Sequence, residues 1–491
     1  MFKQPSNRDV VKEKAFSAAI WKVAERFGAA AVSLMVQIVL ARLLLPADFG
    51  LVAIVSVFVN LASVFAQGGM SVALVREPEI FPKDCATVFW FSFSVSLLLY
   101  AFLFFLAPYV AWFYSMPDLT LVLRVLGLVL MVNAYNGVQV ALMQRDLKMK
   151  QQLYATLIAA VSSGLAGVIA AVLNAGVWAL VIQTLSMQFV TCLVMAFQIR
   201  WRPALSFSLP SLKRMFGFGW KLLVSSLLHT LYMSFYDLLV GKMFSAESLG
   251  LFSQGRKYPS YAESILDSAI GSVTLPAAAM LQNSLEDVRI LMHRSIQMAS
   301  SIVFPAMMAL CVVSRPFVVL VLGPQWAPAA PFFAVFCLAY MLSPITRINL
   351  QCFNAVGRSD LYLKLELVKK IIAVSLILCV SLLHNLYLLS LTSLLYSGLA
   401  VALNMVPSKK LFRYGCIDQL RDLFWPLITS MLACCLALFP SFFLSNDALL
   451  LVTQLGVFVL AYFTVNMILK RGAFMYTKRC VVGALKKITN R

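Results

Sequence analysis

Apolar stretches of about 20 residues follow one another along most of this chain, and their length restricts the fold more than any other feature of the sequence. A helix of that length crosses the hydrocarbon core of a bilayer and satisfies its own backbone hydrogen bonds there, which a lipid-exposed loop cannot do. The pattern therefore predicts an all-α polytopic membrane protein with about fourteen transmembrane helices. The predicted spans are 18–41, 49–75, 87–113, 119–143, 154–173, 176–197, 217–240, 249–280, 296–322, 329–352, 363–384, 386–406, 423–444 and 447–469.

The charge of the chain has a topological explanation. Its 40 lysines and arginines exceed its 20 acids, and in a soluble protein such a surplus would suggest a nucleic-acid partner. When the N-terminus is placed in the cytoplasm, roughly three quarters of the cations fall on the cytoplasmic side of the predicted spans, as the positive-inside rule describes. We therefore expect both termini in the cytoplasm, contact of the basic segments with anionic lipid, and no nucleic-acid partner.

A segment near the first predicted joint returns later in the chain. Residues 40–77 and 240–282 share a helix end with a cation, a short turn, and a Gly-Leu pair that opens the next helix. Such a match at a fixed offset is typical of an internally duplicated membrane bundle, and an even number of spans in each copy predicts parallel repeats. Two such lobes can rock about a central cavity, which is alternating access. The matched pairs include Arg42/Lys242, Gly50/Gly250 and Leu51/Leu251.

The duplication predicts two lobes of six helices, followed by a trailing helix pair. The connector between the lobes is basic, aromatic and interrupted by proline, so we expect it to lie along the inner membrane interface. The predicted parts are a cytoplasmic N-terminal segment (1–17), an N-lobe (18–197), an amphipathic connector (198–216), a C-lobe (217–406), a trailing helix pair (407–469) and a basic cytoplasmic tail (470–491).

Ionisable side chains within the spans identify a candidate site. Each costs roughly 2.5–3.5 kcal/mol near the bilayer centre on insertion scales, so we expect it to face the interior or to reach the interface. In the eighth span, Arg256, Ser260, Glu263 and Asp267 share one helix face, and Lys257 lies beside them. Two interpretations stay open for this stripe, which either lines a cavity or bonds within the bundle and holds it together.

Other spans carry further candidates. In the first span, Lys22, Glu25 and Arg26 share a face near the cytoplasmic end, where either a cavity or the interface can hold them. The remaining candidates lie near span ends: Lys221 and Asp237 in the seventh span, Arg124 in the fourth and Arg347 in the tenth.

The balance of these groups is cationic, which favours an anionic passenger. The predicted substrate-binding cations are Lys22, Arg26, Arg124, Lys221, Arg256, Lys257 and Arg347. The predicted polar or ion-coupling groups are Glu25, Asp237, Ser260, Glu263 and Asp267. Arginine suits a diphosphate because its planar fork bonds phosphate oxygens in pairs.

The sequence predicts no metal, cofactor or ATP site. The ten cysteines form no CxxC pair, the three histidines are far apart, and no GxxxxGK[ST] loop is present. Transport would then be driven by an H⁺ or Na⁺ gradient, by the membrane potential or by the substrate gradient itself.

An ordered set of short motifs resembles one transporter family. The motifs are Leu40–Ile54, Gly68-Gly69, Val75-Arg76-Glu77, Phe216–Trp220, Asp237–Lys242, Leu249–Phe252, Leu275-Pro276, Leu281-Gln282 and Val321–Trp326 with Pro331. With these motifs the chain resembles, over about residues 15–410, Wzx-type polysaccharide flippases of the multidrug/oligosaccharidyl-lipid/polysaccharide (MOP) exporter superfamily, and most of all the colanic-acid-exporter-like branch.

This resemblance implies a MATE-like, two-lobed bundle in the bacterial cytoplasmic (inner) membrane. Such a flippase moves undecaprenyl-diphosphate-linked oligosaccharide repeat units to the outer leaflet for exopolysaccharide, capsule or O-antigen assembly. Its cavity cations are expected to bind the diphosphate or acidic sugars. A polysaccharide polymerase and chain-length or export proteins are the implied protein partners.

Three other functions compete with this interpretation. A cation-coupled multidrug antiporter of the same superfamily would need a passenger site rich in acids, whereas the balance here is cationic. A non-transporting scaffold of a glycan assembly complex would tolerate neutralisation of the buried cations. A membrane glycosyltransferase would need paired acids on an exposed loop, which we do not find. We therefore expect a transporter and not an enzyme.

Overall fold

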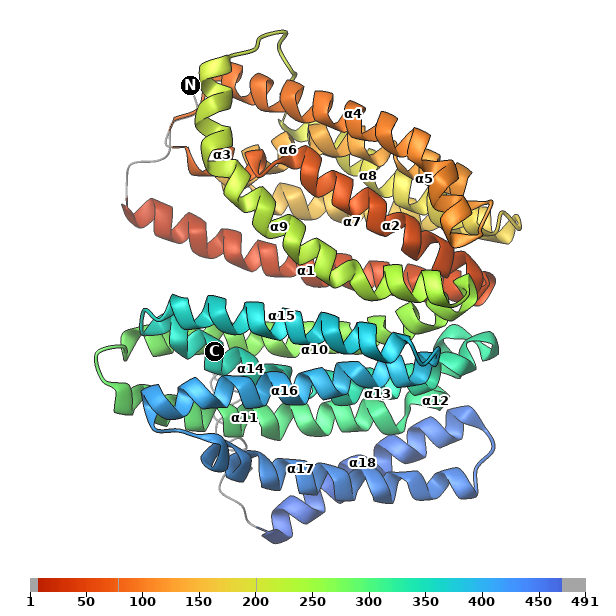
Figure 1. The fold of residues 1–491 in the computed structure, drawn as a ribbon, viewed down its shortest axis with the longest axis vertical. Coiled ribbons are helices and arrows are strands. Elements are labelled where there is room, and N and C mark those ends of the chain that lie inside the picture. The colour runs from red at the N-terminus through yellow and green to blue at the C-terminus, as the bar shows by residue number, and fades with distance from the viewer. Residues whose placement is uncertain (1–7, 78, 200, 470–491) are drawn as a thin grey trace. The chain divides into compact units, whose positions relative to one another are not determined.

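The protein is all-helical over the residues that the structure describes, which are 8–77, 79–199 and 201–469 of a computed structural model (Figure 1). This described part holds eighteen α-helices and two short 3₁₀ helices, and no strand. The all-α prediction is thereby confirmed. The predicted tail 470–491 and residues 1–7 of the predicted N-terminal segment lie outside the described residues.

The chain divides into two compact units, Met1–Gly250 and Leu251–Arg491. The helices of the first unit are α1 (Arg8–Leu43), α2 (Pro46–Gln67), α3 (Met70–Arg76), α4 (Pro82–Tyr114), α5 (Leu119–Leu126), α6 (Val129–Arg145), α7 (Met149–Val172), α8 (Val177–Ile199) and α9 (Leu209–Met243). Helix α10 (Ala246–Met280) begins in the first unit and continues into the second. The second unit also holds α11 (Leu285–Val312), α12 (Ser314–Leu322), η1 (Pro324–Ala329), α13 (Ala330–Tyr340), α14 (Ser343–Ala355), α15 (Ser359–Ser381), α16 (Leu386–Phe412), α17 (Cys416–Leu438), η2 (Phe439–Phe442) and α18 (Asp447–Leu469).

Eleven helical segments of the described part are long and apolar enough to cross a membrane. The other three predicted spans, 18–41, 249–280 and 363–384, are also helical, but α1, α10 and α15 do not meet the same criterion. In α1 the apolar portion is short, at Phe27–Leu43, and α10 and α15 each carry four ionisable groups along their central turns. The polytopic fold is confirmed, and the three helices that fall short are among the most charged.

Helices α2 and α4 begin in the same way, with a proline and an aspartate in the first turn. Each helix starts at a proline, whose fixed φ suits the first turn and whose missing N–H is not needed there. The carboxylate of Asp48 accepts a hydrogen bond from Leu45 N at 3.1 Å, and that of Asp84 accepts one from Phe81 N at 2.9 Å. An acid in the first turn also complements the helix dipole.

The predicted span 49–75 is broken at Gly68 and Gly69. Both residues have positive φ, +53° and +69°, so α2 ends there and α3 starts in a new direction. A Cβ on Gly69 would lie 2.4 Å from the carbonyl oxygen of Gly219 in α9. Glycine is therefore required here both for backbone conformation and for the close approach of α9.

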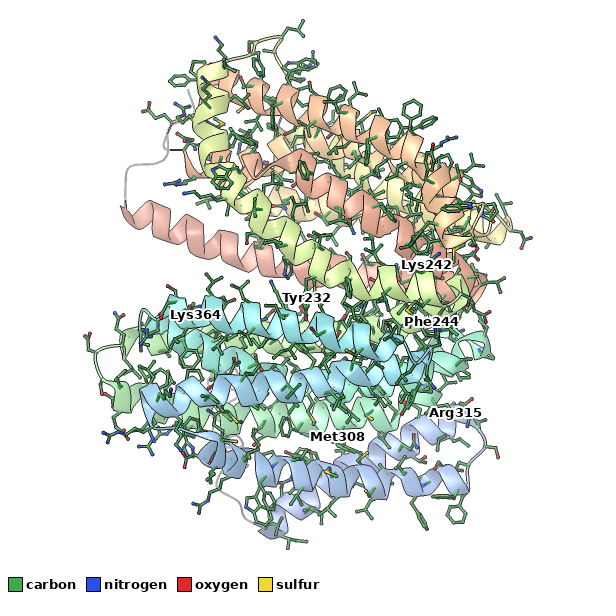
Figure 2. The ribbon with its side chains drawn as sticks, in the orientation of Figure 1. Tyr232, Lys242, Phe244, Met308, Arg315 and Lys364 are labelled. Atoms are coloured by element: carbon green, nitrogen blue, oxygen red, sulfur yellow. The ribbon has the colours of Figure 1, made fainter. Side chains whose placement is uncertain are left out.

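A second close approach joins the first turns of α2 and α10. A Cβ on Gly50 would lie 1.8 Å from the carbonyl oxygen of Ala246, and a Cβ on Gly250 would lie 1.9 Å from that of Pro46. The two glycines that the sequence repeat pairs thus contact each other's helix reciprocally. Lys242, shown near the end of α9 in Figure 2, has its ammonium 4.1 Å from the ring centroid of Phe113.

The predicted connector 198–216 packs on the first unit. The indole of Trp90 donates a hydrogen bond to Ala204 O at 2.9 Å, and the hydroxyl of Tyr135 donates one to Trp201 O at 2.9 Å. Its last residues already belong to α9, which packs against α2, α3 and α4. The two predicted lobes stay a prediction. They were defined by the sequence repeat, whereas the two compact units are defined by packing, so the units do not test the lobes.

The core of the second unit joins α11, α14, α16, α17 and α18. Phe353 and Phe412 stack with their ring centroids 5.9 Å apart. The trailing helices α17 and α18 pack on α11, where the hydroxyl of Tyr462 donates a hydrogen bond to Ser301 O at 2.9 Å.

Candidate functional site

The strongest predicted cluster lies along α10. The guanidinium of Arg256 is 5.7 Å from the ring centroid of Phe252, so part of its charge rests on an aromatic face. The hydroxyl of Ser260 donates a hydrogen bond to Lys257 O at 2.6 Å, which turns it back onto its own helix. Arg256 and Lys257 are both half-buried.

Two turns further, α10 forms an ion pair with α14. A carboxylate oxygen of Asp267 contacts a guanidinium nitrogen of Arg347. Asp267 is only 4% exposed, whereas the side chain of Arg347 is 52% exposed. Glu263 is half-buried one turn before Asp267 on the same face of α10. The structure thus brings together three predicted site residues from two spans.

The predicted group in α1 is held against α7. The ammonium of Lys22 lies 2.6 Å from a carboxylate oxygen of Glu25. The other oxygen of Glu25 accepts hydrogen bonds from Gln152 Nε2 and Thr156 Oγ1, both at 3.4 Å. The side chain of Arg26 lies outside the described residues.

Replacing Lys22 with glutamate is expected to lower the thermal stability of the purified protein more than replacing it with glutamine. The reversal places two carboxylates at i and i+3, beside a Glu25 that is only 9% exposed, whereas glutamine only removes the positive charge. The melting temperatures of the two purified variants, measured beside the unchanged protein, check this. Equal loss from both substitutions would mean that the charge of Lys22 has no role.

The remaining predicted residues lie elsewhere in the first unit. Arg124 donates a hydrogen bond to Phe104 O at 3.2 Å, and its guanidinium lies 4.1 Å from the ring centroid of Phe104, so it binds α5 to α4. Lys221 is exposed and Asp237 is half-buried, and both belong to α9. Their assignment to a substrate site stays a prediction.

The motif at the end of α3 has a structural role. Arg145 donates hydrogen bonds to the carbonyl oxygens of Leu74, at 3.2 Å, and of Glu77. Arg214 of α9 lies 3.6 Å from the Glu77 carboxylate and 3.4 Å from that of Asp84. These two arginines bind the α3–α4 joint to α6 and α9.

Sequence reasoning missed a buried amide pair in the second unit. Gln419 and Asn349 exchange hydrogen bonds, Nε2 to Oδ1 and Nδ2 to Oε1, each at 3.1 Å. Both side chains are fully buried, and Ser408 accepts a further bond from Gln419. The pair fixes α14 against the start of α17. Asn349 lies in the predicted span 329–352, but nothing in the sequence pairs it with Gln419.

It also missed an acid with three partners. Asp422 of α17 lies 2.5 Å from His293 Nδ1, accepts a hydrogen bond from Gln297 Nε2 at 2.9 Å, and contacts the Tyr414 hydroxyl. Burial, and then the hydrogen bond to Asp422, raise the pKa of Tyr414, so this phenol stays a donor. Among the described residues, no three His, Cys, Asp or Glu side chains are grouped so as to hold a metal ion.

Comparison with known proteins identifies relatives over most of the chain. A family model described as "Polysaccharide biosynthesis protein" matches residues 39–331. The chain is 25% identical over 366 residues to the lipopolysaccharide biosynthesis protein WzxC of Escherichia coli (strain K12), covering 73% of each chain. It is 22% identical over 323 residues to the succinoglycan biosynthesis transport protein ExoT of Rhizobium meliloti (strain 1021), covering 65% of each.

One solved structure has a similar fold over nearly the whole chain. The lipid II flippase MurJ in an inward closed conformation superposes with a TM-score of 0.71 and 13% sequence identity. The superposition covers 92% of this chain and 100% of that one. At this level of identity the likeness describes the fold.

Proposed function

This chain belongs to the polysaccharide biosynthesis protein family, and from that membership we propose that it is a flippase for a lipid-linked oligosaccharide. The single observation that carries the proposal is a fold like that of a solved lipid flippase, in a chain whose relatives are named for polysaccharide biosynthesis and transport. A transporter of this kind is a multi-pass protein of the cytoplasmic membrane, and not an enzyme.

The proposed passenger is an undecaprenyl-diphosphate-linked oligosaccharide repeat unit. Its diphosphate and any acidic sugars are anions, and the predicted site residues comprise more cations than acids. Arg256 and Arg347 are the arginines we assign to phosphate oxygens, because a guanidinium offers five N–H donors in a planar fork. Lys257 and Lys22 add positive charge on α10 and α1.

The proposed flippase also has an orientation in the membrane, a driving force for transport and protein partners. The distribution of cations in the sequence supports two cytoplasmic termini, with delivery of the passenger from the inner to the outer leaflet by alternating access. Glu25, Asp237, Glu263 and Asp267 are the acids available to carry a coupling proton or to bind Na⁺. A polysaccharide polymerase and chain-length or export proteins would receive the product.

The test is a deletion strain in which two quantities are measured in the same cells. We expect loss of surface polysaccharide together with accumulation of the complete undecaprenyl-diphosphate-linked repeat unit in the membrane. The intact gene should return both quantities to their normal levels. Accumulation of the complete repeat unit excludes a block in its synthesis, since such a block would prevent it, and places the block at translocation or at a later step. Normal polymer with heightened sensitivity to cationic dyes would overturn the proposal and favour a multidrug antiporter.

A further inference from the structure

Polar side chains from α10 and α14, together with one glycine, meet along one line within the second unit. We call this line the α10–α14 seam. In each helix the members are spaced by four residues, so they stay on one face over two turns. The seam consists of Glu263, Asp267 and Gly271 of α10 and Ser343, Arg347 and Gln351 of α14.

Two contacts fix the register of the seam. Asp267 is ion-paired with Arg347. One turn later, a Cβ on Gly271 would lie 3.0 Å from Gln351 Nε2 and 3.8 Å from Arg347 Cδ. The two helices therefore run in the same direction here, and one turn earlier Ser343 lies at the level of Glu263.

The ion pair of the seam is incompletely satisfied on both sides. Asp267 Oδ2 contacts Arg347, but the buried Oδ1 has no hydrogen-bond partner among the described residues, and neither has Gln351 Oε1. A buried carboxylate oxygen without a partner costs free energy. The ion pair with Arg347 therefore compensates only part of the cost of burying the Asp267 carboxylate. Arg347 remains 52% exposed and has donors to spare.

The exposure of Arg347 constrains its surroundings. A guanidinium that faced lipid tails from the tenth predicted span would be costly, so we expect it to face water or to reach the interface. Among the described residues, the ion-pair partner of this water-facing arginine is one buried acid, so the arginine is available to a second anion. Phosphate is the anion that its planar fork fits best.

We infer that the seam is an anion site in its self-paired state, in which Asp267 occupies Arg347 until a phosphate group of the passenger replaces it. This inference rests on the proposed function, because it takes its ligand from it. When Arg347 turns to the phosphate, Asp267 and Glu263 remain as two neighbouring carboxylates at i and i+4. Like charges at that spacing repel each other, so Asp267 takes a proton from water as the anion binds. Anion loading and proton uptake are thereby coupled at one residue.

Other charged or titratable groups around the seam leave this exchange intact. Glu263 faces Asp267 from the same helix, and Tyr362 of α15 faces Arg347. Arg256 and Lys257 lie further toward the start of α10. No second cation of the described residues forms an ion pair with Asp267, so the departure of Arg347 leaves its charge uncompensated.

The test uses the full chain in nanodiscs of neutral phosphatidylcholine, titrated calorimetrically with farnesyl diphosphate in buffers of different ionisation enthalpy. We expect binding near neutral pH to take up about one proton, since one carboxylate loses its counter-ion. Asp267→Asn mimics the protonated acid and should bind roughly tenfold more tightly without proton uptake. Arg347→Ala should weaken binding at least about tenfold, and Arg347→Lys should weaken it less.

The control for Arg347→Ala is Arg315→Ala, an exposed arginine at the start of α12 (Figure 2), which should bind as the unchanged protein does. Weaker binding by Asp267→Asn, or proton uptake that survives in it, would overturn the exchange even if Arg347→Ala failed to fold. No binding of farnesyl diphosphate by the unchanged chain would overturn the anion site.

The source of the phosphate is decided by a second probe. If farnesyl diphosphate bound more tightly than inorganic pyrophosphate, the ligand of the exchange would be a lipid-linked diphosphate. If the two bound equally, the diphosphate alone would be the ligand of the exchange. Failure of the flippase proposal is a separate result, because it is read from polymer and lipid-linked repeat unit in the deletion strain.

Discussion

Replacing Gly50 with alanine is expected to lower the thermal stability of the purified protein strongly, by at least about 2 kcal/mol in the free energy of unfolding. The added methyl group would lie 1.8 Å from the carbonyl oxygen of Ala246. That atom belongs to a helix backbone and has no rotamer into which it can move, so α2 and α10 must separate. Gly250→Ala should behave alike, since its methyl group meets the carbonyl oxygen of Pro46 at 1.9 Å.

The matched control is Gly398→Ala in α16, where a Cβ would have no atom within 4 Å. Alanine in an open helical position is neutral or stabilises by about 0.4–1 kcal/mol, so this variant should melt at or above the temperature of the unchanged protein. The double variant of Gly50 and Gly250 should be less destabilised than the sum of the two single variants, because one separation relieves both contacts. If Gly50→Ala melted at the same temperature as Gly398→Ala, the close approach of α2 and α10 at Gly50 would be contradicted.

Much of the helical architecture was predictable, because it depends on local properties of the chain. Apolar length located the eleven helical segments of the described part that are long and apolar enough to cross a membrane. The sequence repeat paired Gly50 with Gly250, but it did not predict that the two positions contact each other. Breaks within spans were harder to predict. Gly68 and Gly69 end α2 because they adopt positive φ and meet α9, and α9 follows them in sequence by more than a hundred residues.

Partners of the site residues were not predictable, because they depend on register between distant helices. A helical wheel placed Glu263 and Asp267 on one face, but the contact of Asp267 with Arg347 needs the rotation of α14. Arg124 illustrates the same limit, since its partner is a backbone carbonyl that no residue type reveals. The amide pair of Asn349 and Gln419 crosses seventy residues of sequence, and only packing joins it.

Replacing Arg256 with alanine is expected to reduce export at least roughly tenfold while the protein level stays near normal. This prediction follows from the proposed function, in which Arg256 bonds a phosphate oxygen. A hydrogen bond to a charged group contributes about 1.5–3 kcal/mol, which corresponds to roughly 10- to 100-fold in rate. The measurement is surface polysaccharide and lipid-linked repeat unit in the deletion strain that carries the variant, beside membrane protein level.

The charge and the shape of Arg256 can be separated by a conservative variant. Arg256→Lys keeps the positive charge but loses the planar fork, so export should fall less than with alanine. Arg315→Ala again serves as the matched control, because that exposed arginine lies outside the proposed site. A collapse of protein level in Arg256→Ala would assign the residue to the fold, through its half-buried position beside Phe252. Unchanged export with normal protein level would instead favour a non-transporting scaffold, which tolerates the loss of a buried cation.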